Sequence, residues 1–264
     1  TFPSLYKFYY YMSFDKLLLI EPIMRALKQE GYERPTPIQE QAIPAALEHK
    51  DLLGCAQTGT GKTAAFGIPL IDKRIEAKAE PQALILAPTR ELALQSANEL
   101  GRIAANTSIR TQAIYGGASM QQQVDAIRAG AHILSGTPGR VLDHLSRGTL
   151  NPATLKVLVL DEADEMLSMG FIQELQEIMT YLPKSRQTLL FSATVEDDVR
   201  RMSERYLIDP VVLSLSSDAV GAAGIRHYVY LVSGRNRTGD LMAILEGENP
   251  ETALIFCNTK AQTE

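Results

Sequence analysis

A glycine-rich stretch at residues 56–63, Ala-Gln-Thr-Gly-Thr-Gly-Lys-Thr, constrains this chain more than any other feature. It follows an apolar run, Leu52–Cys55, and precedes residues that can begin a helix. A strand, a glycine loop that ends in Gly-Lys-Thr and a helix form the context of a phosphate-binding P-loop. Gly59 and Gly61 permit backbone angles that turn N–H groups toward a phosphate, and the helix start adds unpaired donors. The alternative is a flexible turn, because Ala56 stands where the strict pattern has Gly.

The end of the same stretch carries the side chains that the chemistry of a P-loop requires. Lys62 would contact the β- and γ-phosphates as a point charge, and the hydroxyl of Thr63 would hold Mg²⁺. The predicted nucleotide-phosphate site therefore consists of Thr58, Gly59, Thr60, Gly61, Lys62 and Thr63.

Composition limits the broad class of the protein. The 264 residues are 45% hydrophobic and 22% charged, as in a globular chain that holds one domain and part of a second. Because the formal net charge is −5, any attraction to nucleic acid must come from a local patch. Cys55 and Cys257 lie on predicted buried strands, which favours a reducing compartment, and no apolar run approaches a membrane span. We therefore expect a cytoplasmic protein that does not contact a membrane.

Apolar runs alternate with helical patterns from residue 52 to residue 215. Most runs are continuous, as in parallel strands that are covered on both faces. This alternation predicts an α/β domain with a mostly parallel sheet, helices on both faces, and ligands at the carboxyl ends of the strands. The predicted strands are Leu52–Cys55, Ala83–Ala87, Arg110–Tyr115, His132–Ser135, Val157–Leu160, Thr188–Phe191 and Val211–Leu215. The predicted helices include Glu91–Ala105, Met120–Ala129, Arg140–Arg147, Ile172–Tyr181 and Asp197–Tyr206.

The first residues of the chain follow a different pattern from the rest. Residues 1–12 are aromatic-rich at their start, and we expect a non-native or disordered extension with the natural start at Met12. Ser13–Glu30 carries apolar residues at helical spacing and stops at Gly31, which predicts a helix. The first domain is therefore expected to span residues 13–215.

The last residues of the chain predict a second domain. Residues 216–224 are small and glycine-rich, as in a linker. Beyond them the pattern predicts strands at His227–Val232 and Ala253–Cys257 with a helix around Asp240–Leu245. Because so few residues cannot bury a core of their own, we expect residues 225–264 to be the truncated start of a second α/β domain.

An acidic stretch, Asp161-Glu162-Ala163-Asp164, directly follows the predicted strand Val157–Leu160. In the catalytic interpretation Asp161 would hold Mg²⁺, partly through water, and Glu162 would orient or deprotonate the attacking water. Alternatively, Asp161 caps a helix, since acidic residues suit a helix start. The neighbouring P-loop favours the catalytic interpretation, in which Lys62, Asp161 and Glu162 carry the reaction.

Three other strand ends carry residues suited to a phosphate backbone. Pro88-Thr89-Arg90 and Thr137-Pro138-Gly139-Arg140 each open a helix, so that amide donors and an arginine side chain lie together. Thr followed by Pro also explains the second stretch as a simple helix start. Gly116-Gly117 permits close approach of a backbone or ligand, or forms a plain turn.

Ser192-Ala193-Thr194 follows the predicted strand Thr188–Phe191 in the same way. Thr194 with Asp197 resembles a helix-capping pair. From the residues alone, this interpretation is as good as any functional role.

Taken in order, these stretches resemble the motifs of the DEAD-box RNA helicases, and the resemblance covers nearly everything from Ser13 to Glu264. Ala56 in place of Gly is that family's own form of the loop, which removes the alternative of a plain turn. The motifs that carry the resemblance are Phe14 with Gly31–Gln39, Ala56–Thr63, Pro88–Ala93, Gly116-Gly117, Thr137–Arg140, Asp161–Asp164 and Ser192–Thr194. Ile255–Lys260 resembles the first motif of that family's second domain.

The resemblance implies a RecA-like P-loop NTPase domain that binds ATP with Mg²⁺. It implies that Gln39 reads adenine, that Phe14 stacks on the base unless it simply packs in the core, and that Arg34 lies in the loop lining the adenine pocket. It also implies that Asp164, Ser192 and Thr194 couple the ATP state to bound RNA.

The implied RNA partner is a single strand or a duplex end, held without sequence specificity by phosphate and 2′-hydroxyl contacts. The protein is expected to be a monomer. The implied RNA-binding residues are Pro88, Thr89, Arg90, Gly116, Gly117, Thr137, Pro138, Gly139 and Arg140.

The family's later motifs, which carry its arginine fingers, would follow Glu264. We therefore expect this chain to bind nucleotide, to hydrolyse ATP poorly and not to unwind RNA alone. Two other hypotheses stay open: a non-catalytic nucleotide- and RNA-binding module, and a P-loop ATPase that acts on another polymer. The glutamine motif at Gln39 and the stretch Thr137–Arg140 argue against the last of these.

Overall fold

The structure, a computed structural model, describes residues 13–76, 78–215, 228–232 and 236–257. The chain divides into two units, residues 1–219 and 220–264. Within the described ranges, every helix is too short or too polar to cross a membrane.

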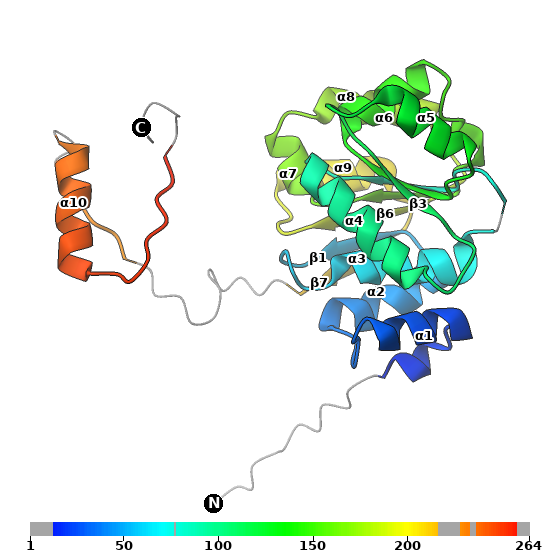
Figure 1. Ribbon diagram of the computed structural model, residues 1–264, viewed down its shortest axis with the longest axis horizontal. Helices are drawn as coiled ribbons and strands as arrows, with labels where there is room; N and C mark the ends of the chain where they lie inside the picture. Colours follow the sequence, from blue (N-terminus) through cyan, green and yellow to red (C-terminus); the bar gives the residue numbers. More distant parts are fainter. Residues whose placement is uncertain (1–12, 77, 216–227, 233–235, 258–264) are drawn as a thin grey trace, which may run out of the picture. The chain divides into compact units, whose positions relative to one another are not determined.

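The first unit is built on a sheet of seven parallel strands (Figure 1). The strands are β1 (Leu52–Cys55), β2 (Ala83–Leu86), β3 (Thr111–Ile114), β4 (Ile133–Gly136), β5 (Val157–Leu160), β6 (Gln187–Ser192) and β7 (Val211–Ser214). Their order across the sheet is β3-β4-β2-β5-β6-β1-β7. Leu86 pairs with both Gly136 and Leu160, and Cys55 pairs with Ser192. Since all strands run the same way, these carboxyl ends share one edge of the sheet, as the sequence predicted.

Helices cover both faces of the sheet because side chains alternate along each strand. On β5, Val157 and Val159 belong to one core cluster, whereas Leu158 and Leu160 belong to another. The first cluster is completed by α1 to α4, and the second by α5 to α9; Figure 1 shows α1 and α2 on one side of the sheet and α5, α6 and α8 on the other. These helices are α1 (Glu21–Gln29), α2 (Pro37–Leu47), α3 (Lys62–Pro69), α4 (Arg90–Ile103), α5 (Met120–Arg128), α6 (Pro138–Ser146), α7 (Ala163–Ser168), α8 (Ile172–Tyr181) and α9 (Asp197–Tyr206). Shorter elements are two 3₁₀ helices, Phe14–Leu17 and Pro152–Thr154, and a π-helical turn, Leu70–Arg74.

The predicted single helix over Ser13–Glu30 is wrong, because the chain breaks between a 3₁₀ turn and α1. Leu18 has a φ of 53°, in the left-handed region that an α-helix cannot include. Pro22 lies in the first turn of α1, the place in a helix where proline is tolerated. The N–H of Ile20 donates to a carboxylate oxygen of Asp72 at 2.7 Å, which fixes the break against the turn after α3.

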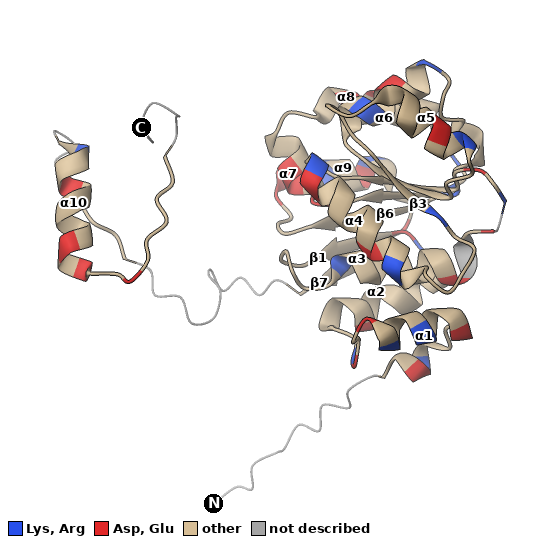
Figure 2. Ribbon diagram, viewed as in Figure 1, with Lys and Arg blue, Asp and Glu red and all other residues tan. Residues whose placement is uncertain are grey.

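Charged residues in the first unit lie on helices and loops, and both signs are interspersed there (Figure 2). None of the seven strands contains Lys, Arg, Asp or Glu. Functional charges in this unit must therefore come from the helices and loops.

The described part of the second unit contains one helix, α10 (Arg237–Glu248), which extends the predicted helix Asp240–Leu245 at both ends. The predicted strands are wrong, since residues 228–232 and 253–257 form no strand. A strand requires a partner backbone, and two or three short segments cannot supply a stable sheet. Their apolar side chains are exposed instead.

Cys257 also departs from the sequence analysis, because it is exposed whereas Cys55 is buried. Four other predictions lie outside the described residues. These are the extension at residues 1–12, the linker at residues 216–224, His227, and the motif residues 258–260.

Candidate active site

The P-loop connects the carboxyl end of β1 to the start of α3. Gly59 and Gly61 have φ angles of 81° and 88°, in the left-handed region that favours glycine. At Gly61 a Cβ would also lie 2.4 Å from Nε2 of Gln39, so a larger residue would have to displace that amide. The loop thus has the backbone that the sequence predicted, with the first N–H groups of α3 behind it.

Lys62 is the first residue of α3, and its side chain is only 5% exposed. Its Nζ lies 2.9 Å from Oε1 of Glu162, whose side chain is 10% exposed. The same carboxylate oxygen accepts a hydrogen bond from the hydroxyl of Thr58 at 2.9 Å. Among the described residues, Nζ of Lys62 forms this ion pair but no hydrogen bond. An ammonium has three donors, so Lys62 retains hydrogen-bonding capacity for an anion in the loop.

The acidic stretch after β5 begins with two buried carboxylates, Asp161 and Glu162. Burial raises the pKa of Asp161 to about 7; the nearby Lys62 opposes this shift and Glu162 reinforces it. Oδ1 of Asp161 accepts the N–H of Glu162 at 3.1 Å. Glu162 itself takes the N-cap position of α7, with a φ of 52° and no side-chain capping bond. The alternative in which Asp161 caps the helix is therefore wrong.

These residues fit a magnesium ion that is held together with phosphate oxygens. No group of three or more His, Cys, Asp or Glu side chains among the described residues could hold a metal alone. Mg²⁺, however, usually takes one or two carboxylates, several waters and the phosphates of its substrate. The buried carboxylate of Asp161 at a strand end gains from a nearby cation, because a buried charge is costly without a partner. Thr63, in the first turn of α3, offers the hydroxyl ligand of a P-loop.

Gln39 is 1% exposed, and both ends of its amide are engaged. Oε1 accepts the N–H of Thr36 at 3.0 Å, and Nε2 donates to the carbonyl of Gly61 at 3.0 Å. The second bond joins the start of α2 to the P-loop, a contact that the sequence did not predict. An amide has two N–H groups, so one donor of Gln39 is left for a ligand.

An open pocket of about 820 Å³ lies over this glutamine. Its volume is within the range of about 300–1,000 Å³ that is usual for small-molecule sites. Its lining includes Tyr32, Glu33, Arg34, Thr36, Gln39, Gly59 and Gly61. The structure thus brings Arg34 and Gln39 together with the two P-loop glycines.

Phe14 lies beside this pocket but is only 4% exposed. Its ring packs edge-on against Tyr32, with 6.2 Å between the ring centroids. This contact corresponds to the core-packing alternative for Phe14. Stacking of Phe14 on a base stays a prediction.

Asp164 is joined by three hydrogen bonds to the last residue of β6 and to the segment that follows it. Oδ2 of Asp164 accepts the N–H of Thr194 at 2.9 Å and its hydroxyl at 3.0 Å. The N–H of Asp164 donates to the hydroxyl oxygen of Ser192 at 3.3 Å. The helix-capping alternative for Thr194 is wrong, because Glu196 takes the N-cap position of α9. The three predicted coupling residues therefore form one cluster.

The predicted RNA-binding stretches after β2 and β3 lie next to each other. Thr89 caps α4 by accepting the N–H of Leu92 at 3.2 Å. Arg90 follows in the first turn of the helix, and its side chain is exposed. The Arg90 guanidinium lies 5.4 Å over the ring of Tyr115. A Cβ at Gly117, where φ is 82°, would lie 3.9 Å from Nη1 of Arg90. Gly116-Gly117 and Pro88-Thr89-Arg90 thus share one surface.

Arg140 is hydrogen-bonded to the loop after β3, both directly and through Gln123, a residue that the sequence analysis missed. Its Nη1 donates to the carbonyl of Ala118 at 3.2 Å and to Oε1 of Gln123 at 3.1 Å. Gln123 is 4% exposed and donates through Nε2 to the carbonyl of Tyr115. Nε2 of His144 lies 3.2 Å from the same Oε1, and burial lowers the pKa of His144, which favours its neutral form. The sole sequence signal was a polar residue in the buried stripe of α5.

The stretch Thr137-Pro138-Gly139-Arg140 forms the start of α6. Thr137 takes the N-cap position without a side-chain bond, and Pro138 follows in the first turn. Pro138 is buried, whereas Gly139 is exposed beside the half-buried Arg140. This arrangement agrees with the predicted helix start.

Comparison with known proteins identifies the family to which this chain belongs. The family model described as DEAD/DEAH box helicase matches residues 36–202, a span that holds the P-loop and the acidic stretch. This chain belongs to the DEAD/DEAH box helicase family. The DEAD-box ATP-dependent RNA helicase CshA of Geobacillus kaustophilus is 42% identical over 252 residues, which are 96% of this chain and 54% of that protein. The ATP-dependent RNA helicase CshA of Listeria monocytogenes is 43% identical over 251 residues, which are 95% of this chain and 48% of that protein.

A solved structure agrees with this assignment. The crystal structure of a DEAD box protein from the hyperthermophile Methanococcus jannaschii is 38% identical, with a TM-score of 0.76. The match covers 96% of this chain and 68% of that one. The predicted RecA-like α/β fold is therefore confirmed. This DEAD-box chain spans about half the length of the curated relatives it matches.

Proposed function

We propose that this DEAD-box chain binds ATP with Mg²⁺ in the P-loop and contacts the backbone of RNA beside it. The observation that carries the proposal is the buried ammonium of Lys62, which has an ion pair with Glu162 but no hydrogen bond. A buried cation with unused donors at a helix start is suited to phosphate oxygens. The relatives named as ATP-dependent RNA helicases support the choice of nucleotide and polymer.

Lys62 exchanges partners when phosphate enters the loop. In the structure, Oε1 of Glu162 lies 2.9 Å from the ammonium. Phosphate oxygens replace that carboxylate, and Glu162 is then free to orient a water and to accept its proton. Thr63 and Asp161 would hold Mg²⁺, which would neutralise charge on the phosphates. The amide of Gln39 provides one remaining donor toward the base, an arrangement that favours adenine, whose N7 is an acceptor.

RNA is held on the surface formed after β2, β3 and β4. Arg90 is exposed there beside Gly117, and the exposed Gly139 opens α6 close to Arg140. Such groups contact phosphates and sugars, so the proposed binding does not depend on base sequence. Asp164 and Thr194 connect the acidic stretch to the segment after β6, and we assign them the coupling between nucleotide and RNA.

The 264-residue chain by itself is proposed to hydrolyse ATP slowly. Phosphoryl transfer is accelerated about 10³–10⁵-fold by an arginine that stabilises the transferred group. Arg140 already donates to Ala118 and Gln123, and Arg90 lies on the surface that we assign to RNA, so we do not assign that role to either.

Two assays on the same chain test this proposal. Calorimetry with ADP and Mg²⁺ should give one saturable site, and ATP turnover should be slow and little changed by single-stranded RNA. Absence of ADP binding would reject the function. Rapid turnover that single-stranded DNA stimulates as well as RNA would favour an ATPase of another polymer.

A further inference from the structure

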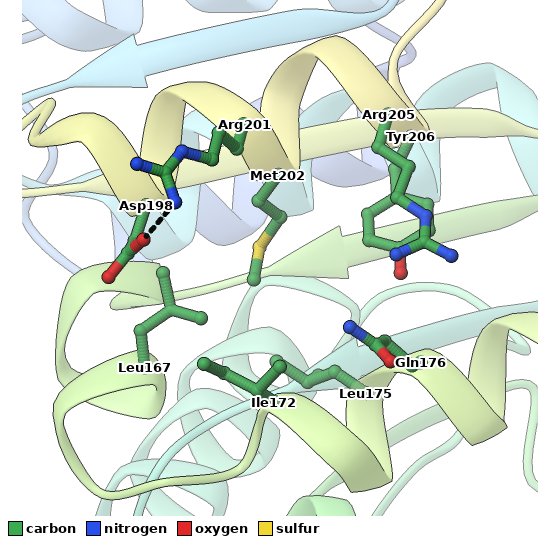
Figure 3. A pocket seen from close by; sticks show the side chains of 9 residues that line it. All are labelled: Leu167, Ile172, Leu175, Gln176, Asp198, Arg201, Met202, Arg205 and Tyr206. Carbon is green, nitrogen blue, oxygen red and sulfur yellow. Dashed lines mark ion pairs between the residues drawn. The ribbon is translucent and has the colours of Figure 1, made fainter.

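A pocket of about 250 Å³ lies between α9 on one side and α7 and α8 on the other, and its lining includes Gln176 and the ion pair of Arg201 with Asp198 at 3.4 Å as well as apolar side chains (Figure 3). Met202 points from α9 toward Ile172 and Leu175 of α8, and Leu167 of α7 closes one end (Figure 3). Leu175 and Met202 are buried, whereas Ile172 is 41% exposed at the mouth. The pocket therefore has an apolar floor that is open to solvent.

A second pocket, of about 240 Å³, adjoins the first because both are lined by Arg205 and Tyr206. It adds two more cations, Lys184 and Arg186, and one carboxylate, Asp51. The carboxylate is already satisfied, since its oxygens accept the N–H groups of Thr188 at 2.8 Å and Ile208 at 2.7 Å. Three cations therefore share the second pocket with one carboxylate whose oxygens already accept hydrogen bonds, so the pocket is basic.

The cations of this second pocket can form further ion pairs and hydrogen bonds. Among the described residues, neither Lys184 nor Arg205 forms an ion pair. Nε of Arg186 is buried without a hydrogen-bond partner, although its two other nitrogens donate to Pro183 and Met179. A group that brings carboxylates to this pocket would satisfy these cations.

Neither pocket shares a lining residue with the nucleotide pocket. The basic pocket is formed by Asp51 before β1, by Lys184, Arg186 and Thr188 around the start of β6, and by the end of α9 with Ile208, which places it at the amino ends of the strands. The P-loop and the acidic stretch follow the carboxyl ends of β1 and β5. An occupant of this surface would therefore leave the nucleotide pocket open.

We infer that the two pockets together bind an acidic segment of a partner protein, with one apolar side chain in the first pocket and carboxylates at the second. Each pocket is smaller than the usual range of about 300–1,000 Å³ for small-molecule sites, but a pocket of this size with an apolar floor suits a single anchor residue. Single-stranded RNA fits less well, because the buried floor of the first pocket, Leu175 and Met202, is apolar and offers no partner to a phosphate or a sugar hydroxyl. Charge complementarity then selects a segment that is rich in Asp and Glu.

Methyl NMR on the full chain tests this inference directly. The probe is a capped peptide with a leucine–phenylalanine pair flanked by two glutamates on each side. Its addition should cause saturable shifts of the methyl signals of Met202 and Ile172, without displacing bound ADP. Two control peptides, one with lysines in place of glutamates and one with serines in place of the apolar pair, should leave these signals unchanged.

Two variants on α9 separate the pocket from general charge. Arg205→Glu reverses an exposed cation that lines both pockets and should weaken peptide affinity about tenfold or more. Arg200→Glu makes the same change on the same helix outside both pockets and should leave the affinity unchanged. Unchanged thermal midpoints of both variants establish that the fold is intact.

Three results would overturn the inference. The first is the absence of shifts at millimolar peptide. The second is equal binding of the lysine peptide or equal weakening by both variants. The third is that inorganic phosphate or single-stranded RNA shifts these methyl signals while the acidic peptide does not, which would make the surface an anion site or part of the RNA face.

Discussion

Nζ of Lys62 lies 2.9 Å from Oε1 of Glu162, and both side chains are almost completely buried. The P-loop lysine is thus paired with the residue that is proposed to activate water. In this state Glu162 takes the place that a phosphate oxygen needs. Nucleotide binding and release of the catalytic carboxylate are therefore one event in our account.

The first prediction concerns this competition. Glu162→Gln removes the negative charge but retains an oxygen that can accept from Thr58. Because phosphate no longer competes with a carboxylate for Lys62, ADP affinity should rise about tenfold, the low end of what one close ion pair contributes. Glu165→Gln is the matched control, since Glu165 is exposed in the same helix, and its ADP affinity should equal that of the wild type. Weaker ADP binding by Glu162→Gln would contradict the competition.

The second prediction concerns pH. Burial raises the pKa of Asp161 to about 7 in the folded protein, whereas an unfolded Asp titrates near about 3.9. The folded state therefore binds the proton more tightly, and this contribution to stability is complete below about pH 4 and lost as pH rises through about 7. In the nucleotide-free protein, with EDTA present, the free energy of unfolding should fall between about pH 5 and 8.

Asp161→Asn provides the comparison for this pH dependence. An amide does not titrate but keeps an oxygen for the N–H of Glu162, so urea unfolding should show a smaller fall over the same pH range. Asp197→Asn, at an exposed position, should behave as the wild type. Identical pH profiles of the wild type and Asp161→Asn would contradict the assignment to Asp161.

The third prediction concerns the link between Asp164 and Thr194. Thr194→Val removes the hydroxyl donor at 3.0 Å and leaves the backbone donor at 2.9 Å. Loss of one hydrogen bond to a charged acceptor at this exposed position should lower the free energy of unfolding by about 1 kcal/mol. ADP affinity should stay unchanged, whereas any effect of RNA on ADP affinity should decrease. A variant that binds ADP more weakly but keeps its response to RNA would contradict the coupling role.

The fourth prediction concerns Gln39, which the structure gives two tasks. Its amide holds the carbonyl of Gly61 and retains one donor for a base. Gln39→Ala should therefore weaken both ADP and GDP, because the P-loop loses support, but should weaken ADP more. Calorimetry with the two nucleotides measures the ratio. An equal loss for both would restrict Gln39 to positioning of the loop.

The bounds of a helix or strand could be predicted from the sequence where its residue pattern fitted only one type of element. Val157–Leu160 and Ile172–Tyr181 begin and end as predicted, because a continuous apolar run and an amphipathic period each match their element. The helix over Ser13–Glu30 failed at Leu18, since the turn there depends on the distant carboxylate of Asp72. Helical periodicity carries no information on such a contact.

The site was predictable as a set of motifs but not as a network. Strand ends and glycines indicated where Lys62 and Asp161 would lie, because parallel strands bring those ends together. Gln123 was missed because a single buried glutamine in a helix has no distinctive spacing. Its importance emerges only from its contacts with Tyr115, Arg140 and His144.

The most direct test of the central claim is calorimetric titration of ADP with Mg²⁺ into Glu162→Gln and into the double variant Lys62→Ala/Glu162→Gln. The double variant avoids an unpaired buried carboxylate, so the difference isolates Lys62. Our account predicts one ADP site in Glu162→Gln and an affinity about tenfold or more lower in the double variant. Equal affinities in the two proteins would contradict phosphate binding by Lys62.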